Sequence, residues 1–198
     1  MRGARARSVA ALSARVICTG PGCGGCWWTS VPRPCVSSVA RKAIERARVT
    51  AHQPKDPNFE QRVRDSFAKQ QFMATIGATL ARVEPGEVDL VLDKRDSLTQ
   101  QHGFLHAGVL ASAADSACGY AALSLMPAGA AVLSIEFKIN MLAPATGDRF
   151  LARGRVLRAG RTVTVCWGEV VSYADEAERI VATMVATMMT VTDRGLSD

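Results

Sequence analysis

From residue 58 onward, the spacing of hydrophobic residues changes several times, and each spacing predicts a different element. In the polar segment 58–71, hydrophobic residues recur at every fourth position, which predicts an amphipathic helix with Asn58 as its N-cap. These residues are Phe59, Val63 and Phe67. The segments Thr75–Val83 and Glu87–Leu92 flank the turn tripeptide Glu84-Pro85-Gly86 and predict a β-hairpin.

A long apolar segment follows a polar loop over residues 93–101. Residues 107–126 are mainly Ala, Leu, Ser and Val, whose small side chains suit a helix packed closely on a sheet, and Pro127 helps to end it. In residues 133–141 apolar and polar side chains alternate, as in a half-buried strand. Three further strand-like segments follow, separated by turn residues: Asp148–Leu157, Thr162–Tyr173 and Arg179–Thr192.

The predicted order is one helix, two strands, one long apolar helix and four strands, which is an α+β arrangement. A helix that is apolar nearly all round needs burial on every side, yet one helix cannot cover both faces of a six-stranded sheet. A strongly curved antiparallel sheet wrapped around the helix would meet both conditions. Its free edges favour pairing between two copies, so we expect at least a homodimer.

Basic residues gather in the first 50 residues, which hold nine Lys and Arg residues but one acid, Glu45. The 198-residue chain has 24 bases and 18 acids, so residues 51–198 keep 15 bases against 17 acids. This balance predicts no bulk attraction of the body to nucleic acid. No segment approaches the roughly 20 apolar residues that a membrane span requires, so we expect no membrane association.

We interpret residues 1–50 as a leader that is separate from a body spanning residues 51–198. Its richness in Arg, Ala and Ser is typical of a mitochondrial or plastid transit peptide, whereas its glycines and prolines favour a disordered, inert extension. The protein would be mitochondrial in the first case and cytoplasmic in the second. The leader holds four of the six cysteines, Cys18, Cys23, Cys26 and Cys35. Cys23 and Cys26 have the spacing of half a metal knuckle without a suitable second pair, so no metal site is predicted.

One acidic residue, Asp115, interrupts the long apolar helix. A carboxylate in a buried helix is costly unless it is paired or its pKa moves, so this acid is held by structural hydrogen bonds or retained for chemistry. Just upstream, a Gly-containing loop opens the same helix. The first N–H groups of a helix lack intrahelical partners, and the small residues Ala107 and Gly108 would let an oxyanion approach them. His106 would orient this loop or help to polarise a carbonyl, or else be satisfied by backbone.

Asp115 and Ala107 are eight residues apart in the sequence. That separation is roughly 12 Å along a helix axis, so one chain cannot easily place both groups on one substrate atom. Two helices running antiparallel across a two-fold axis could do so. We therefore expect a site that is shared between subunits.

In residues 58–192, the chain resembles the hotdog-fold acyl-CoA thioesterases of the phenylacetyl-CoA thioesterase (PaaI-like) family. The resemblance is carried by His-Gly-Phe-Leu-His-Ala-Gly at 102–108, Ala-Asp-Ser-Ala at 114–117, Asn-Met-Leu-Ala-Pro-Ala at 140–145 and Gly160-Arg161. It implies a hotdog fold, in which a strongly curved antiparallel sheet of about six strands wraps one long central helix. It also implies hydrolysis of an acyl-CoA to the free acid and CoA, without a cofactor.

The resemblance further implies roles for the residues around the start of the helix. Asp115 would act as nucleophile or as general base on water. The N–H of Ala107, together with that of Gly108, would donate to the thioester oxygen, with His106 beside it. The family more often has Gly at the position of Ala107, and this departure narrows the approach of the substrate.

Other candidate residues match the family less directly. Gln100 falls where relatives carry a residue that positions water, and Ser134 falls where some contact the other side of the site; each could equally be a solvated residue. Arg158 and Arg161 suit the phosphates of CoA, or form a solvated charged face. Phe104 could line the acyl pocket or belong to the core.

Two other functions remain open alternatives. A hydratase or dehydratase of the same fold pairs a His with an acid, as His102 or His106 could pair with Asp115. A non-catalytic acyl-CoA-binding module would keep its function without that carboxylate. The identity of the acyl chain and the choice between homodimer and homotetramer also stay open.

Overall fold

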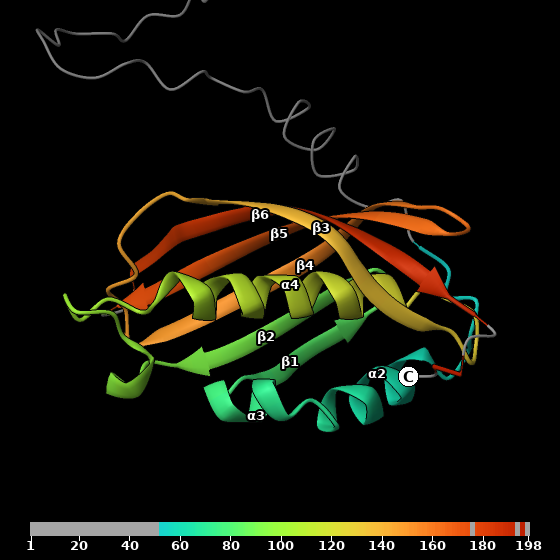
Figure 1. Ribbon diagram of the computed structural model, residues 1–198, viewed down its shortest axis with the longest axis horizontal. Helices are drawn as coiled ribbons and strands as arrows, with labels where there is room; N and C mark the ends of the chain where they lie inside the picture. The colour runs from blue at the N-terminus through green and yellow to red at the C-terminus, as the bar shows by residue number, and fades with distance from the viewer. Residues whose placement is uncertain (1–51, 175–176, 193–194, 197–198) are drawn as a thin grey trace, which may run out of the picture. The chain divides into compact units, whose positions relative to one another are not determined.

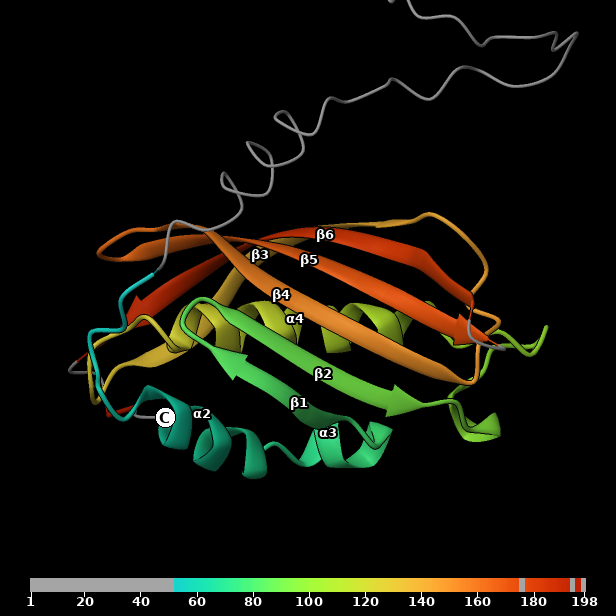
Figure 2. The same cartoon turned by 180° about the vertical axis from the view of Figure 1, so that it is seen from behind.

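The computed structural model describes residues 52–174, 177–192 and 195–196, in which a curved sheet surrounds one long helix (Figures 1 and 2). The leader expected over residues 1–50, with its four cysteines, lies outside the described residues. The helices are α2 (Phe59–Ala68), α3 (Gln71–Ile76), the 3-10 helix η1 (Asp96–Leu98) and α4 (Ala107–Leu123). The strands are β1 (Thr79–Glu84), β2 (Glu87–Asp93), β3 (Ala131–Met141), β4 (Arg149–Ala159), β5 (Val163–Ala174) and β6 (Ala177–Val191).

The six strands form one antiparallel sheet in the order β1-β2-β4-β5-β6-β3. The sheet curves so that α4 lies in its concave side, packed against β2 to β6 (Figure 1). The strand that follows α4, β3, therefore lies at the sheet edge opposite β1. This arrangement confirms the predicted α+β fold with a curved sheet around one central helix.

The N-terminal part of the body differs from the sequence prediction. The single helix expected over residues 58–71 ends at Ala68, and a second helix, α3, occupies part of the expected first strand, which begins only at Thr79. Met73 and Ile76 are both buried, a three-residue spacing that suits a helix. Gly77 ends α3 with a φ of 72°, a left-handed conformation that glycine adopts without strain. The prediction of a strand from residue 75 to residue 78 is therefore wrong.

The position of Asn58 at the N-cap of α2 was predicted, but the capping contact differs. The Asn58 side chain makes no capping hydrogen bond. Instead, the backbone N–H of Asn58 donates to Asp56 Oδ1 at 2.9 Å. The start of α2 is therefore fixed by a carboxylate that lies one turn outside the helix.

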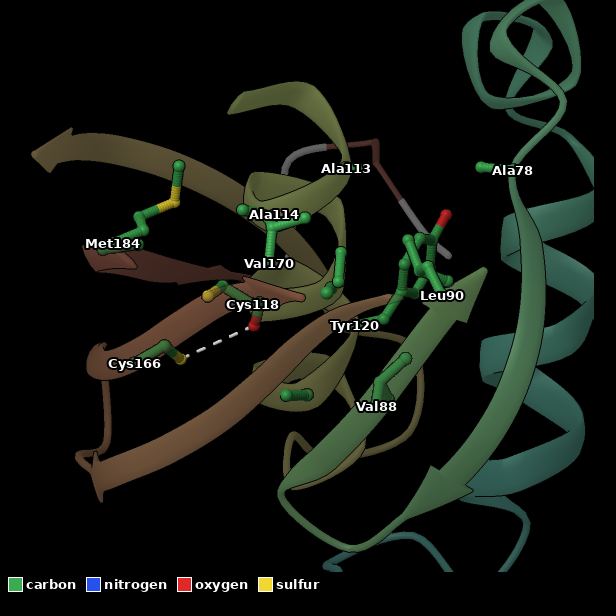
Figure 3. Packing of buried hydrophobic residues seen from close by; sticks show 14 of the residues in the cluster. Ala78, Val88, Leu90, Ala113, Ala114, Cys118, Tyr120, Cys166, Val170 and Met184 are labelled. Carbon is green, nitrogen blue, oxygen red and sulfur yellow. Dashed lines mark hydrogen bonds between the residues drawn. The ribbon is translucent and has the colours of Figure 1, made fainter. Parts of the chain in front are cut away.

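Small residues let α4 approach the sheet closely. Ala117 and Cys118 are completely buried, and Figure 3 shows Cys118 beside Cys166 and Val170 of β5. Gly154 of β4 lies directly below this part of the helix, and a Cβ atom there would overlap the carbonyl group of Ala117. Glycine within a strand is typical of such a close backbone approach.

The two halves of α4 differ in burial. All residues from Ala117 to Leu123 are buried. In the first half, Ala107 and Gly108 are exposed, and one side of the helix at Ser112 and Asp115 is only half-buried. Burial of the whole circumference, as expected from the sequence, is therefore wrong for the N-terminal half, because no element among the described residues covers that side.

The alternating strand is also more exposed than predicted. Leu133, Ile135 and Phe137 of β3 are 45%, 53% and 45% exposed. The expected half-burial is wrong because β3 is an edge strand that pairs only with β6. An apolar edge strand of this kind presents unpaired backbone groups together with uncovered hydrophobic side chains.

A buried arginine holds the C-terminal end of α4. Its guanidinium donates to the carbonyl oxygens of Leu123 (2.7 Å), Met126 (3.0 Å) and Pro127 (2.7 Å). This residue, Arg62 of α2, also forms an ion pair with Asp56 at 3.1 Å, and their side chains are only 10% and 7% exposed. Arg62 thus bonds the last carbonyl of α4 and two carbonyls of the segment that follows it, and it ties α2 to the central helix.

Candidate active site

Asp115 lies on the half-buried side of α4, facing β3. Its Oδ1 accepts a hydrogen bond from Ser134 Oγ at 2.7 Å, so the structure brings these two candidate residues together. Burial raises the pKa of Asp115 above its ordinary value, and the hydrogen bond from Ser134 offsets part of that rise. The carboxyl group is thus neither fully solvated nor neutralised by a cation.

A small cavity of about 110 Å³ lies beside this carboxyl group. Five of its seven lining residues carry side chains that can form hydrogen bonds. The seven are Gln70, Asp115, Ser116, Gly119, Tyr120, Val132 and Ser134. The cavity is therefore a polar site within an otherwise apolar interior.

The N-terminus of α4 offers one free hydrogen-bond donor. His106 is the N-cap, and its Nδ1 accepts the N–H of Gly108 at 2.9 Å. This bond requires an unprotonated Nδ1, which leaves the ring proton on Nε2. The N–H of Gly108 is therefore occupied, contrary to the expectation that it donates to substrate, whereas the N–H of Ala107 has no partner within the described part of the chain.

Ala107, which carries the free N–H, lines a second, larger and more open cavity of about 420 Å³. Its lining is mostly apolar and includes Phe104, Leu105, Leu110 and residues 141–145. Gln100 also lines it, and its Oε1 accepts the backbone N–H of His102. The structure thus brings three sequence candidates, Gln100, Phe104 and Ala107, to one pocket.

The two cavities share no lining residue. Within one chain, Asp115 and the Ala107 N–H therefore open into different spaces, as the separation of about two helical turns predicts. A substrate atom that reaches both groups would need them from two copies of the chain. This expectation is developed below.

The two candidate phosphate ligands lie elsewhere. Arg158 is exposed near the end of β4, and Arg161 lies in the turn between β4 and β5. Neither lines the cavities beside Asp115 or Ala107. Arg161 instead lines a third cavity, of about 510 Å³, together with Lys55. The structure does not bring these arginines to the candidate site within one chain.

The two cysteines of the body are buried thiols. Burial raises the pKa of Cys166 to about 12 and also raises that of Cys118. A thiol that stays protonated is a poor nucleophile, so neither competes with Asp115 for a catalytic role.

Two further findings concern metals and membranes. Across residues 52–174, 177–192 and 195–196, no three His, Cys, Asp or Glu side chains gather so that they could hold a metal ion. In the same residues no helix is long and apolar enough to cross a membrane.

Gln70 is a cavity residue that the sequence interpretation missed. It lies at the junction of α2 and α3, in a segment predicted to be the interior of one helix, and 45 positions before Asp115. The available signal was the loss of the four-residue hydrophobic spacing after Phe67. That signal marks a bend but carries no information on what the bend faces.

Comparison with known proteins adds a family and a fold. The family described as the thioesterase superfamily matches residues 102–178. A protein of Saccharolobus solfataricus named "Putative esterase" is 33% identical over 104 residues, which cover 52% of this chain and 74% of that protein.

Solved structures extend the likeness to most of the body. A thioesterase family protein from Silicibacter pomeroyi has 51% sequence identity and a TM-score of 0.68, covering 68% of this chain and 99% of that one. The Escherichia coli PaaI protein, from the phenylacetic acid degradation operon, has 20% identity and a TM-score of 0.62, covering 68% and 94%. The second likeness concerns the fold alone, and the two together confirm the predicted hotdog arrangement.

Proposed function

Because the chain belongs to the thioesterase superfamily, we propose that it hydrolyses acyl-CoA thioesters to the free acid and CoA at a site built by two copies. The observation that carries the proposal is the placement of two groups on α4. A half-buried carboxyl lies in a small polar cavity, and a free N–H lies in an open apolar one. The small cavity supplies the carboxyl that the open cavity lacks, and the open cavity supplies the N–H donor that the small one lacks.

Asp115 supplies the base or the nucleophile. As a base, its carboxylate takes a proton from water while the water oxygen attacks the thioester carbonyl carbon. As a nucleophile, it attacks that carbon itself and forms an anhydride, which water then cleaves. A raised pKa strengthens the carboxylate in both roles, and the hydrogen bond from Ser134 to Oδ1 leaves Oδ2 free to react.

Ala107 supplies the oxyanion donor. Its N–H has no partner in the described chain and lies at the positive end of the α4 dipole. A thioester oxygen gains negative charge as the tetrahedral intermediate forms, and this donor stabilises it. The carbon–sulfur bond then breaks, and in the general-base route the thiolate of CoA receives the proton held by Asp115.

The second copy completes the site. The half-buried side of α4 and the exposed apolar residues of β3 form a continuous uncovered region next to Asp115. Pairing two β3 edges about a two-fold axis would bury both and set the two α4 helices antiparallel. Asp115 of one copy would then face Ala107 of the other. A homodimer meets this requirement, and so does a homotetramer built from such dimers.

The first test measures CoA release from aromatic, short, medium and long acyl-CoAs by the wild type and by Asp115→Asn. We expect the substitution to reduce kcat by about 10²–10⁴-fold, because it removes the base but retains the side-chain shape. Acyl-CoA binding to Asp115→Asn should persist in calorimetry. Hydrolysis at the wild-type rate by Asp115→Asn would end the proposal.

A mixing experiment tests whether the site is shared. Asp115→Asn and Ala107→Pro are each expected to be nearly inactive. If subunits exchange at random, mixed dimers contain one intact site, so an equimolar mixture should regain about a quarter of wild-type activity. A mixture that stays as inactive as its components would place both groups in the same chain and contradict the two-copy site.

No observation favours the hydratase alternative. The ring of His106 is engaged with the N–H of Gly108, and no histidine lines the cavity of Asp115. Water addition to crotonyl-CoA, measured beside CoA release, is therefore expected to be absent.

A further inference from the structure

The two cavities cannot receive the same part of a substrate. The nucleotide of CoA is far too large for 110 Å³ and must remain in solvent, so the arm that carries it has to leave through an open passage. The apolar cavity beside Ala107 is open and about 420 Å³ in volume. If the proposed function holds, the acyl group therefore enters the small cavity beside Asp115, and the pantetheine arm runs through the open one.

The size of the small cavity limits the acyl group. The cavity has about a quarter of the volume of the apolar one, so it favours a short acyl group. The polar lining also limits its chemistry. A plain hydrocarbon chain would leave the half-buried carboxamide of Gln70 without a hydrogen-bond partner from the substrate, which is unfavourable.

Gln70 is a lining residue whose side chain could hydrogen-bond to the acyl chain. Its backbone is fixed on both sides, since its N–H donates to Phe67 O at 3.0 Å and its carbonyl accepts from Ala74 N at 3.2 Å. Its side chain is half-buried and makes no hydrogen bond within the described residues. Asp115 and Ser134 are bonded to each other, so the carboxamide of Gln70 is an available donor and acceptor in the cavity.

We infer that the cavity beside Asp115 is an acyl subsite for short acyl groups that carry a hydroxyl or oxo group, and that Gln70 determines this specificity by hydrogen bonding to that group. The inference rests on the proposed thioesterase function but goes beyond it. It assigns a substrate class and a residue from the α2–α3 junction, outside the segment that the superfamily matches.

Two substrate pairs of equal size test the inference. 3-Hydroxybutyryl-CoA is compared with 3-methylbutyryl-CoA, and 4-hydroxybutyryl-CoA with pentanoyl-CoA, so that each pair exchanges a hydroxyl for a methyl group. In the wild type, kcat/KM for at least one hydroxylated substrate should exceed that of its partner about tenfold, the usual worth of a hydrogen bond inside a site. In Gln70→Met, which keeps the length of the side chain, this ratio should fall towards one.

Gln71→Met is the matched control. It makes the same chemical change one residue later, where the side chain is exposed and lines no part of the cavity. The ratio for Gln71→Met should equal that of the wild type. Equal ratios in the wild type and Gln70→Met, or a wild type that prefers the methyl substrates, would overturn the inference and leave the proposed hydrolysis intact.

A binding measurement separates the two proposals. In the Asp115→Asn background, which is not expected to turn over, calorimetry compares the Kd of each pair with and without Gln70→Met. Loss of the hydroxyl preference with Gln70→Met supports the subsite even if the wild type releases no CoA, in which case only the proposed function fails. Binding without a preference that depends on Gln70 refutes the subsite whatever the wild type hydrolyses.

Discussion

The rest of the chain buries the C-terminal end of α4 and bonds its carbonyl groups, but it leaves the N-terminal end uncovered. At the C-terminal end, Arg62 satisfies three carbonyl oxygens, Asp56 balances its charge, and the surrounding residues are buried. At the N-terminal end, the N–H of Ala107 has no partner in the described chain and one side of the helix is uncovered. The closed end stabilises the fold, whereas the open end keeps a donor available for a ligand.

The difference shows where the structure tolerates an unfavourable arrangement. A half-buried carboxyl costs stability, and the N–H of Ala107 gains no hydrogen bond from the described chain. They lie within about two turns of each other, whereas at the opposite end of the same helix the carbonyl oxygens of Leu123, Met126 and Pro127 accept hydrogen bonds from Arg62. We therefore expect substitutions at the closed end to change stability alone, and substitutions at the open end to change activity first.

The largest effect is expected from substituting Arg62, which bonds the C-terminal end of α4. Arg62→Met removes the ion pair and leaves the nearly buried Asp56 alone, so the free energy of unfolding should fall by about 3–5 kcal/mol. Urea denaturation measures this loss. The kcat per folded molecule should stay at the wild-type value, and a drop in kcat without a stability change would contradict the division between the two ends.

Arg64→Met is the matched control, because Arg64 lies on α2 like Arg62. Arg64 pairs with Glu60 one turn away, with side chains that are 43% and 54% exposed. Arg64→Met should therefore cost only about 0.3–0.5 kcal/mol, as exposed pairs of this spacing do.

The next largest effect is expected from removing the free N–H at the N-terminal end of α4. Ala107→Pro deletes the free N–H at the first helical position, where proline is tolerated, and His106 already has the extended backbone (ψ 138°) that precedes proline. The kcat should fall by about 10²–10³-fold, or about 2.7–4 kcal/mol of transition-state stabilisation. Thermal unfolding should be nearly unchanged, so a large loss of Tm would mean that the variant tests folding rather than catalysis.

A smaller effect is expected from the stability cost of Asp115. Because the pKa of Asp115 is raised in the folded protein, the folded state is destabilised as pH rises from the unfolded carboxyl value of about 3.9 through the folded one. Asp115→Asn should therefore raise Tm at neutral pH, and the gain should shrink as pH falls through that window. Scanning calorimetry at several pH values checks this, and a Tm gain that grows in acid would refute it.

The smallest effect is expected from Ser134→Ala. The lost hydrogen bond lowered the pKa of Asp115, so its removal should move the acidic limb of the kcat/KM profile to higher pH. The wild-type limb itself should lie above the range of an ordinary aspartate. An acidic limb that moves to lower pH, or does not move, would show that Asp115 is not the titrating group.

The sequence predicted the parts of the fold that depend on local periodicity. Alternation identified β3, turn residues separated the other strands, and the apolar segment ending before Pro127 identified α4. It failed where burial depends on neighbours. The alternation in β3 indicates a buried side correctly only if something covers the strand, and within the described chain Leu133, Ile135 and Phe137 stay exposed.

The candidate site was predictable in part for a similar reason. Asp115 stood out because an acid is unfavourable in an apolar helix, and Ala107 because the first N–H groups of a helix lack intrahelical partners. The occupation of the Gly108 N–H by His106 was not predictable, since it depends on a ring orientation. Gln70 was not predictable either, because only the tertiary fold brings it to the cavity of Asp115.

The missing side chain at Gly154 restricts which substitutions the protein can accept. The strand backbone meets the carbonyl of Ala117 directly, and Ala117 lies two residues from Asp115. Any larger residue at position 154 would push the helix away from the sheet, and Asp115 with it. A mutation in β4, which contributes no atom to the proposed reaction, could thus abolish activity.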